Sequence, residues 1–426
     1  MREMKNSGIE WIGNIPESWT VKRIKYLSYK ERNSFVDGDW IESPFIIDNG
    51  IRYLTTGNIG DGKFKIQGDG FISNETFKAL NCKFAFPGDL VFSRLNAPFG
   101  RSCILPNIEQ KYVLAVDNVI LRTDQNKDYI CYVTQCLGYQ RTVEDVSSGT
   151  TMKRVSRTNL GTIKIPLPPI FEQNVIAKFL DDRCGKIDSI YKDVEKQIET
   201  LEQYKRSIIT ESVTKGINKE VTLIEDNNEW FVCIPTKWIK TRIGAVYKLR
   251  NTKVSDKDYM PLSVTMKGVV PQLENAAKTD AHDDRKLVKK GDFAINSRSD
   301  RRGSCGIAPC DGSISLINIV LEPKQNMNSR YYNWLFHTTE FADKFYKWGH
   351  GIVDDLWTTT WQEMKNIIIP MPPISEQEEI ANYLDEKCAE IDSIIEDKKK
   401  QLEILENYKK SLIYEYVTGK KEVPCE

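Results

Sequence analysis

Basic and polar side chains gather on three stretches that follow short strand-like runs. Arginine can pair with guanine O6 and N7, asparagine can pair with adenine, and serine, threonine and lysine can hold phosphate. Each residue taken singly is also explained as part of a solvated loop, so the prediction concerns the three loops together. The predicted nucleic-acid contacts are Arg94, Asn96 and Arg101; Thr150, Thr151, Lys153 and Arg154; and Arg298, Ser299, Arg301 and Arg302.

Catalytic patterns are weak in this sequence. Asn96-Ala97-Pro98-Phe99 resembles the Asn-Pro-Pro-Phe/Tyr signature of amino-methyltransferases, but Ala97 departs from it and no glycine-rich cofactor loop follows a strand. We interpret these four residues as a turn and keep a DNA adenine methyltransferase as an alternative. No nucleotide-binding P-loop, nucleophile elbow or zinc-protease motif occurs, and only three histidines are present. We predict no catalytic residue, no metal site and no cofactor bound by this chain.

A long internal repeat organises the 426 residues. Residues 165–214 align without a gap with residues 369–418, and about 29 of the 50 positions are identical. Each copy opens with Ile-Pro-x-Pro-Pro-Ile-x-Glu-Gln and ends with Val-Thr. Weaker similarity relates residues 10–24 to 229–243 and residues 86–94 to 289–298. The repeating unit is therefore half of the protein, rather than one helix.

The repeated segments predict two long helices. The prolines fix the approach to each helix, and a Glu-Gln pair follows in the first turn, where a carboxylate suits the helix dipole. Apolar residues recur every seven positions, which is typical of a coiled coil, with Lys398 interrupting one row. The predicted seam comprises Ile187, Ile190, Val194, Leu201, Tyr204 and Ile208 in the first copy, and Ile391, Ile394, Leu405, Tyr408 and Leu412 in the second.

The net charge of zero hides an uneven distribution. The two predicted helices are acidic, whereas residues 1–171 hold 22 basic against 18 acidic residues and residues 215–375 hold 23 against 19. A mild positive charge suits regions that approach phosphate, while the acidic helices suit another partner. No apolar run is long enough to cross a membrane, and the N-terminus lacks the apolar core of a signal peptide. Together with ten dispersed cysteines, these features predict a cytoplasmic protein.

We predict a mixed α/β fold with two globular recognition domains and two long antiparallel helices, related by a pseudo-twofold repeat. The expected domains are residues 1–165, 166–216, 217–369 and 370–420, in the order globular, helical, globular, helical. Strands are expected at 90–94, 116–122, 294–298 and 315–323, and amphipathic helices at 129–143 and 331–349.

These features together resemble the specificity subunit of type I restriction-modification systems. The resemblance rests on Glu10-Trp11, Ile15-Pro16 and Trp19 near the start, the Gly-Asp turns at 88–89 and 291–292, and both copies of the proline and Glu-Gln segment. It covers essentially the full chain.

The resemblance implies that each globular region reads half of a split DNA site and that the helices set the spacing. It also implies double-stranded DNA, two modification (methyltransferase) subunits and restriction subunits as partners. Those partners would use S-adenosylmethionine, ATP and Mg²⁺, and this chain would perform no chemistry. Two alternatives stay open beside the methyltransferase: the specificity subunit of a type IIB-like system, and a coiled-coil adaptor that does not bind DNA.

Overall fold

Two proline pairs determine where the long helices begin. In the computed structural model, strand β12 (Lys164–Leu167) leads through Pro168-Pro169 into helix α5 (Ile170–Lys215), and β25 (Ile368–Met371) leads in the same way into α10 (Ile374–Val417). Proline lacks a backbone N–H and cannot continue a helix beyond its first turn, so each strand stops where its helix starts. The structure describes residues 2–149, 152–226, 228, 230–272, 282–349 and 357–424.

The chain forms two compact units. Unit 1 consists of Met1–Val194 and Lys400–Glu426, and unit 2 consists of Glu195–Lys399. Their boundaries differ from the four expected segments, because each long helix contributes one part to each unit. Unit 1 is therefore built from both ends of the chain.

The central sheet of unit 1 has the antiparallel strand order β4-β11-β8-β9. Leu90 and Phe92 of β8 pack into a core shared with the helices, whereas Val91 faces a second core. Side chains alternate between the two faces of a strand, so both faces of this sheet are covered. The strands are β4 (Phe35–Asp37), β8 (Leu90–Ser93), β9 (Ser102–Ile104) and β11 (Asn118–Leu121), and the second sheet joins β5 (Ile51–Leu54), β6 (Phe71–Ile72), β7 (Phe84–Ala85) and β10 (Tyr112–Leu114).

Unit 2 repeats this arrangement, with the central order β16-β24-β21-β22. Phe293 and Ile295 of β21 enter the large core of the unit, and Ala294 faces a smaller one. The strands are β16 (Tyr247–Arg250), β21 (Phe293–Asn296), β22 (Cys305–Ile307) and β24 (Asn318–Pro323), beside a sheet of β17 (Lys253–Val254), β20 (Arg285–Val288) and β23 (Gly312–Ser315) and the pair β18 (Leu262–Thr265) and β19 (Gly268–Pro271).

Short elements complete each unit. Unit 1 also contains β1 (Met4–Asn6), β2 (Asn14–Pro16), β3 (Thr20–Arg23), α1 (Asn74–Ala79) and α4 (Arg157–Thr162); unit 2 also contains β13 (Leu223–Glu225), β14 (Cys233–Pro235), β15 (Ile239–Arg242), α6 (Ile243–Val246) and α9 (Trp361–Met364). Strand β3 pairs with β12, and β15 pairs with β25, so each strand that leads into a long helix is anchored in the same way. No helix in the described ranges is long and apolar enough to span a membrane.

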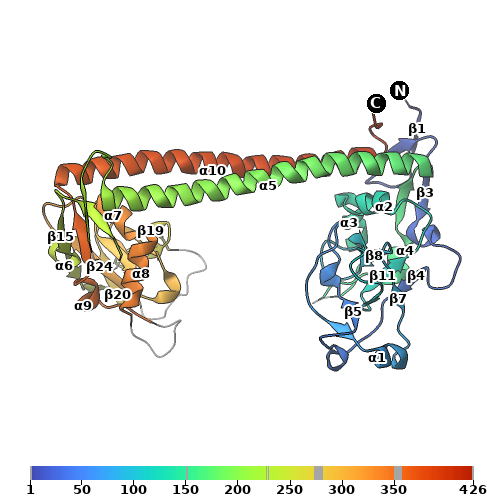
Figure 1. The fold of residues 1–426 in the computed structure, drawn as a ribbon, viewed down its shortest axis with the longest axis horizontal. Helices are drawn as coiled ribbons and strands as arrows, with labels where there is room; N and C mark the ends of the chain where they lie inside the picture. Colours follow the sequence, from blue (N-terminus) through green and yellow to red (C-terminus); the bar gives the residue numbers. More distant parts are fainter. Residues whose placement is uncertain are drawn as a thin grey trace. The chain divides into compact units, whose positions relative to one another are not determined.

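The expected helices at 129–143 and 331–349 are each a pair of helices. Unit 1 has α2 (Lys127–Thr134) and α3 (Leu137–Asp145), and unit 2 has α7 (Ser329–Phe336) and α8 (Thr339–Lys347). In unit 2 the Thr338 side chain accepts the N–H of Phe341, which starts a new helix at that point. Figure 1 shows α2 and α3 between the central sheet of unit 1 and α5.

Identical residues in the two repeats share two hydrogen bonds to the backbone. Buried Gln173 accepts the N–H of Asn126 at 3.0 Å and donates to the Pro168 carbonyl at 2.9 Å. Gln377 does the same with Asn328 (2.9 Å) and the Pro372 carbonyl (2.8 Å). Glutamine suits this position because its amide both accepts and donates.

The Val-Thr ends of the repeats also have matching roles. The Tyr129 hydroxyl donates to the carbonyl of Val417 at 3.0 Å in unit 1, and the Tyr331 hydroxyl donates to the carbonyl of Val213 at 2.8 Å in unit 2. The end of α10 is thus part of the core of unit 1, and the end of α5 is part of the core of unit 2.

The two helices run antiparallel. Within unit 1, the ring of Phe179 packs against that of Tyr416 with a tilt of 40°, and further along α5, Asp188 pairs with Lys409. Within unit 2, Lys205 and Asp392 form the repeat-related ion pair at 2.6 Å. The first expected row is buried or half-buried: Ile187, Val194, Leu201, Ile208, Ile391, Leu405 and Leu412.

The second expected row needs correction. Ile190, Tyr204, Ile394 and Tyr408 are exposed by 44–57%. The inward row lies one position further along, and its members are Cys184, Tyr191, Ile198, Lys205, Cys388, Ile395, Leu402 and Lys409. Lys205 and Lys409 are tolerated there because each pairs with an aspartate of the opposite helix. A heptad pattern read from apolar residues alone misses such lysines.

Candidate nucleic-acid interface

Arg94 lies at the end of β8 and points inward. Its side chain is 4% exposed, and its guanidinium donates to the carbonyls of Val116 (2.5 Å) and Val155 (3.2 Å). Burial lowers its pKa from the ordinary arginine value, while the charges of Asp37 and Asp117 act in the opposite direction. The expected loop tip is therefore a buried anchor, and we remove Arg94 from the residues that approach DNA.

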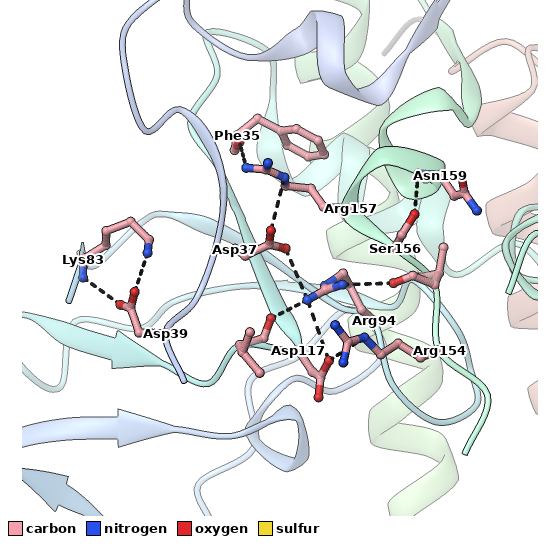
Figure 2. Close-up of polar contacts among 12 residues, drawn as sticks. Phe35, Asp37, Asp39, Lys83, Arg94, Asp117, Arg154, Ser156, Arg157 and Asn159 are labelled. Atoms are coloured by element: carbon pink, nitrogen blue, oxygen red, sulfur yellow. Dashed lines mark hydrogen bonds and ion pairs between the residues drawn. The ribbon is translucent and has the colours of Figure 1, made fainter. Parts of the chain in front are cut away.

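Two carboxylates connect Arg94 to the surface. Asp37 lies 3.3 Å from Arg94 and 3.3 Å from Arg157, and Asp117 lies 3.7 Å from Arg94 and 3.1 Å from Arg154. Figure 2 shows this chain of alternating charges, from Arg157 through Arg94 to Arg154. We call these five residues the charge chain. Its two outer arginines are 40% and 47% exposed, so positive charge reaches solvent at both ends.

Arg101 is also buried, and it has a structural role. Its guanidinium donates to the carbonyls of Thr56, Ile59, Leu95, Asn96 and Pro98. Burial lowers the pKa of Arg101, while the charge of Asp61 acts in the opposite direction. These bonds tie two loops of unit 1 together, and we remove Arg101 from the proposed contacts as well.

The turn at Asn96–Phe99 is fixed by these bonds. Asn96 adopts a left-handed backbone conformation with φ of 62° and is exposed, whereas Phe99 is buried in the main core of unit 1. This geometry agrees with a turn. Lys153 is exposed beside Glu144 at 3.0 Å. Thr150 and Thr151 lie outside the described residues.

The corresponding loop of unit 2 is open to solvent. Arg301 is 68% exposed, Arg302 pairs with Asp343 at 2.7 Å, and Arg298 pairs with Asp300 at 3.2 Å. Arg302 also lies over the ring of Tyr346, at 5.7 Å. A shallow pocket of about 400 Å³ opens here, lined by Ser299, Asp300, Arg302, Asp343, Tyr346, Lys347 and Trp357.

Strand pairing corrects the equivalence of the two loops. Ser93 pairs with Asn118 in unit 1, and Asn296 pairs with Asn318 in unit 2. The next residues are therefore equivalent: Arg94 corresponds to Ser297, and Arg298 comes one position later. Successive side chains of an extended strand point to opposite faces, which explains why Arg94 is buried and Arg298 is half-exposed.

Three contributors to the charge chain were missed by sequence reasoning. Asp37, Asp117 and Arg157 lie in separate segments, and no local motif links them. Only the adjacency of β4, β11 and α4 brings them to Arg94. No group of three or more His, Cys, Asp or Glu residues suited to a metal occurs within the described ranges.

A family model decides the identity of this duplicated fold. The model for the type I restriction modification DNA specificity domain matches residues 16–200 and 235–404. The chain belongs to this family. The predicted resemblance and specificity-subunit function are confirmed, and the family provides DNA recognition rather than catalysis.

Known relatives support the same assignment over the full length. The putative type I restriction enzyme MjaX specificity subunit of Methanocaldococcus jannaschii is 26% identical, with 97% of this chain and 96% of that one covered. Among solved structures, a chain from a study of assembly and conformational transition of the type I R-M system gives a TM-score of 0.72 at 14% identity, over 96% and 99% of the two chains. The HsdS subunit from Thermoanaerobacter tengcongensis gives 0.55 at 15% identity, over 96% and 98%. These structures share the mixed α/β fold.

Proposed function

We propose that this specificity subunit reads a split DNA site, with one half-site for each unit. The observation that carries the proposal is the central sheet built twice with the same strand order, while the loops at its edge differ. A repeated scaffold with unlike loops suits two half-sites of different sequence. The exposed arginines of unit 2 and the outer ends of the charge chain supply the positive charge that DNA binding requires.

The long helices are the proposed docking surface for two modification subunits. Ile190 and Tyr204 of α5 are exposed, and so are their repeat partners Ile394 and Tyr408. Neighbouring positions that face inward differ between the copies, for example half-buried Tyr191 against buried Ile395. Exposed apolar residues kept in both copies, where the core does not require them, suit the same partner bound twice.

The remaining components follow from this assembly. Restriction subunits would join it, S-adenosylmethionine would be bound by the modification subunits, and ATP and Mg²⁺ would be used by the restriction subunits. The complex would act on double-stranded DNA in the cytoplasm. The chain itself would supply recognition and spacing.

Mapping adenine methylation at single-base resolution tests this function. The chain would be produced with its modification subunits in a host that lacks adenine methylation. We expect one motif made of two unlike half-sites separated by a fixed gap. Methylation of a continuous motif, or none despite an assembled complex, would contradict the proposal.

Lengthening both helices tests the spacing role. Seven residues inserted after Gln197 and seven after Lys400 would keep the heptad phase of the pairing. The half-site sequences should stay the same and the gap should change. An unchanged gap would refute a role for the helices in spacing.

A further inference from the structure

The charge chain has a consequence for base recognition by unit 1. We propose that Arg154 is a specificity-determining residue that reads a guanine in the half-site of unit 1, with Asp117 and buried Arg94 as its positioning residues. This inference rests on the proposed reading of two half-sites. It goes further by naming one side chain, one base and the groups that orient the contact.

The geometry of Arg154 suits a two-pronged contact. Its Nε lies 3.1 Å from Oδ1 of Asp117, and its side chain is 47% exposed. Neither terminal amine of this guanidinium makes a hydrogen bond within the described part of the chain. An arginine that forms an ion pair through Nε keeps its terminal N–H groups for an outside acceptor pair, and guanine O6 with N7 is the pair in DNA that matches this fork.

Backbone hydrogen bonds also fix the position of Arg154. Its N–H donates to the Ser148 carbonyl at 2.8 Å, its carbonyl accepts from Ser148 at 2.9 Å, and it bridges to Leu95 beside β8. The next residue, Val155, donates to the carbonyl of Arg94 at 3.0 Å. A side chain with a fixed backbone and an ion pair at Nε loses less conformational freedom on binding, which favours a selective contact over a loose one.

Buried Arg94 helps to neutralise the negative charge of Asp117. Asp117 is 20% exposed and lies between Arg94 and Arg154, so its negative charge is shared by two cations. The charge chain as a whole has three arginines and two aspartates, which leaves one net positive charge. Because Arg94 is buried, that positive charge is available at Arg154 and Arg157, where an electronegative base edge or phosphate could approach.

The same positions in unit 2 carry no charge. Arg94 corresponds to Ser297, and Asp117 corresponds to Ile317, because the same backbone hydrogen bond occurs in both units. The N–H of Arg94 donates to the Asp117 carbonyl, and the N–H of Ser297 donates to the Ile317 carbonyl. The bridges Leu95 to Arg154 and Arg298 to Thr358 equate Arg154 with Thr358. The fold therefore does not require these charges. Chemistry that differs at matched places of a shared scaffold is what two unlike half-sites demand.

A phosphate contact would behave differently from a base contact. Loss of a phosphate contact weakens binding to all sequences about equally, whereas loss of a guanine contact relaxes one base position. Arg157 fits the phosphate role better, because one of its terminal amines already donates to the Phe35 carbonyl at 3.1 Å. The two arginines at the ends of the charge chain thus give distinguishable predictions.

The experiment maps the methylated motif of the full complex for Arg154→Ala, Arg154→Lys and Asp117→Asn. We expect Arg154→Ala to relax a single guanine position in one half-site by about 5- to 150-fold, as for a lost bidentate contact. Arg154→Lys should also relax it, because an ammonium keeps the charge but lacks the fork. Asp117→Asn should relax the same position more weakly, and Lys164→Ala, an exposed basic residue on β12, should change nothing.

Correct reading of the other half-site by each variant reports that the complex is assembled and folded. The proposal is overturned if Arg154→Ala leaves the motif unchanged, or if Arg154→Ala weakens methylation of all sites equally and Arg154→Lys restores it fully. It is also overturned if the altered base lies in the half-site of unit 2. Arg302→Ala identifies that half-site, because its loop belongs to unit 2. Absence of any bipartite motif with the unmodified chain would instead refute the proposed function.

Discussion

Units 1 and 2 share a scaffold and differ at its edge. Both have the four-stranded order with two covered faces, the glutamine that joins strand to helix, and a tyrosine bonded to the end of the opposite repeat. Unit 1 places a buried arginine between two aspartates where unit 2 has Ser297, Asn251 and Ile317 nearby. The repeat therefore preserves the scaffold, while the loops at its edge differ in charge and can carry different recognition chemistry.

The largest difference between the units should appear when Arg94 is removed. Arg94→Ala would leave Asp37 and Asp117 without their shared buried partner, and loss of one member of a buried ionic group costs about 3–5 kcal/mol. Ser297→Ala, at the matched position, should cost less than about 1.5 kcal/mol. Chemical denaturation followed by hydrogen exchange in each unit measures both. Equal effects of the two substitutions would contradict the different roles of Arg94 and Ser297.

The next prediction concerns which unit is destabilised by a substitution in each long helix. Leu412 lies in the second repeat but packs in the core of unit 1, whereas its repeat partner Ile208 packs in unit 2. Leu412→Ala and Ile208→Ala should each cost about 2–5 kcal/mol. Hydrogen exchange should show that Leu412→Ala loosens the N-terminal unit and Ile208→Ala the other. Loosening of the unit nearest in sequence would contradict the observed division of the helices.

A smaller and similar effect is expected at the two glutamine joints. Gln173→Leu and Gln377→Leu each leave a partly buried backbone N–H and a buried proline carbonyl without their partner, at about 1–3 kcal/mol. Gln173→Leu also removes a bond to the Gln125 side chain. Matching losses, measured by unfolding of each unit, would support one joint used twice. A loss at only one site would show that the joints have diverged.

The smallest predicted effect is on the pH dependence of the unfolding free energy. Burial raises the pKa of Asp188, but hydrogen bonds from Lys409 and Lys63 outweigh it, so the pKa lies below its ordinary value. A lowered pKa adds stability above the unfolded value near 3.8, and this is lost as pH falls through the folded pKa. Asp188→Asn should therefore flatten the acid response of unit 1 by about 1 kcal/mol or less, measured as unfolding free energy from pH 7 to 3. Asp392→Asn, which lies in unit 2, should leave the acid response of unit 1 as it is.

The sequence predicted the architecture because the repeat was long and its proline joints were distinctive. It predicted strands such as β8 and β24 from short apolar runs that the structure contains. The sequence-based prediction of side-chain direction failed where it depended on a shift of one residue along the strand. Arg94 and Arg298 look equivalent in sequence, yet one extra residue before Arg298 places them on opposite faces.

The coiled-coil seam could likewise not be predicted completely from local sequence. Ile190 looks more apolar than Lys205, but the aspartate that makes Lys205 acceptable is supplied by another helix. The partners of Arg94 likewise come from strands far away in the chain. Local patterns predict elements, whereas pairing between distant elements decides which charges are buried.

The bond from Tyr129 to the carbonyl of Val417 bears on how the protein is made. Unit 2 is a continuous stretch, so all of its residues are available before residues 400–426 are synthesised. Unit 1 lacks Leu412, Tyr416 and Val417 until that later segment has been made. Domains usually complete folding in the order of their synthesis. Here the half that leaves the ribosome first should be the last to close, and a released chain that ends at Lys399 should have a folded second half and an unfinished first half.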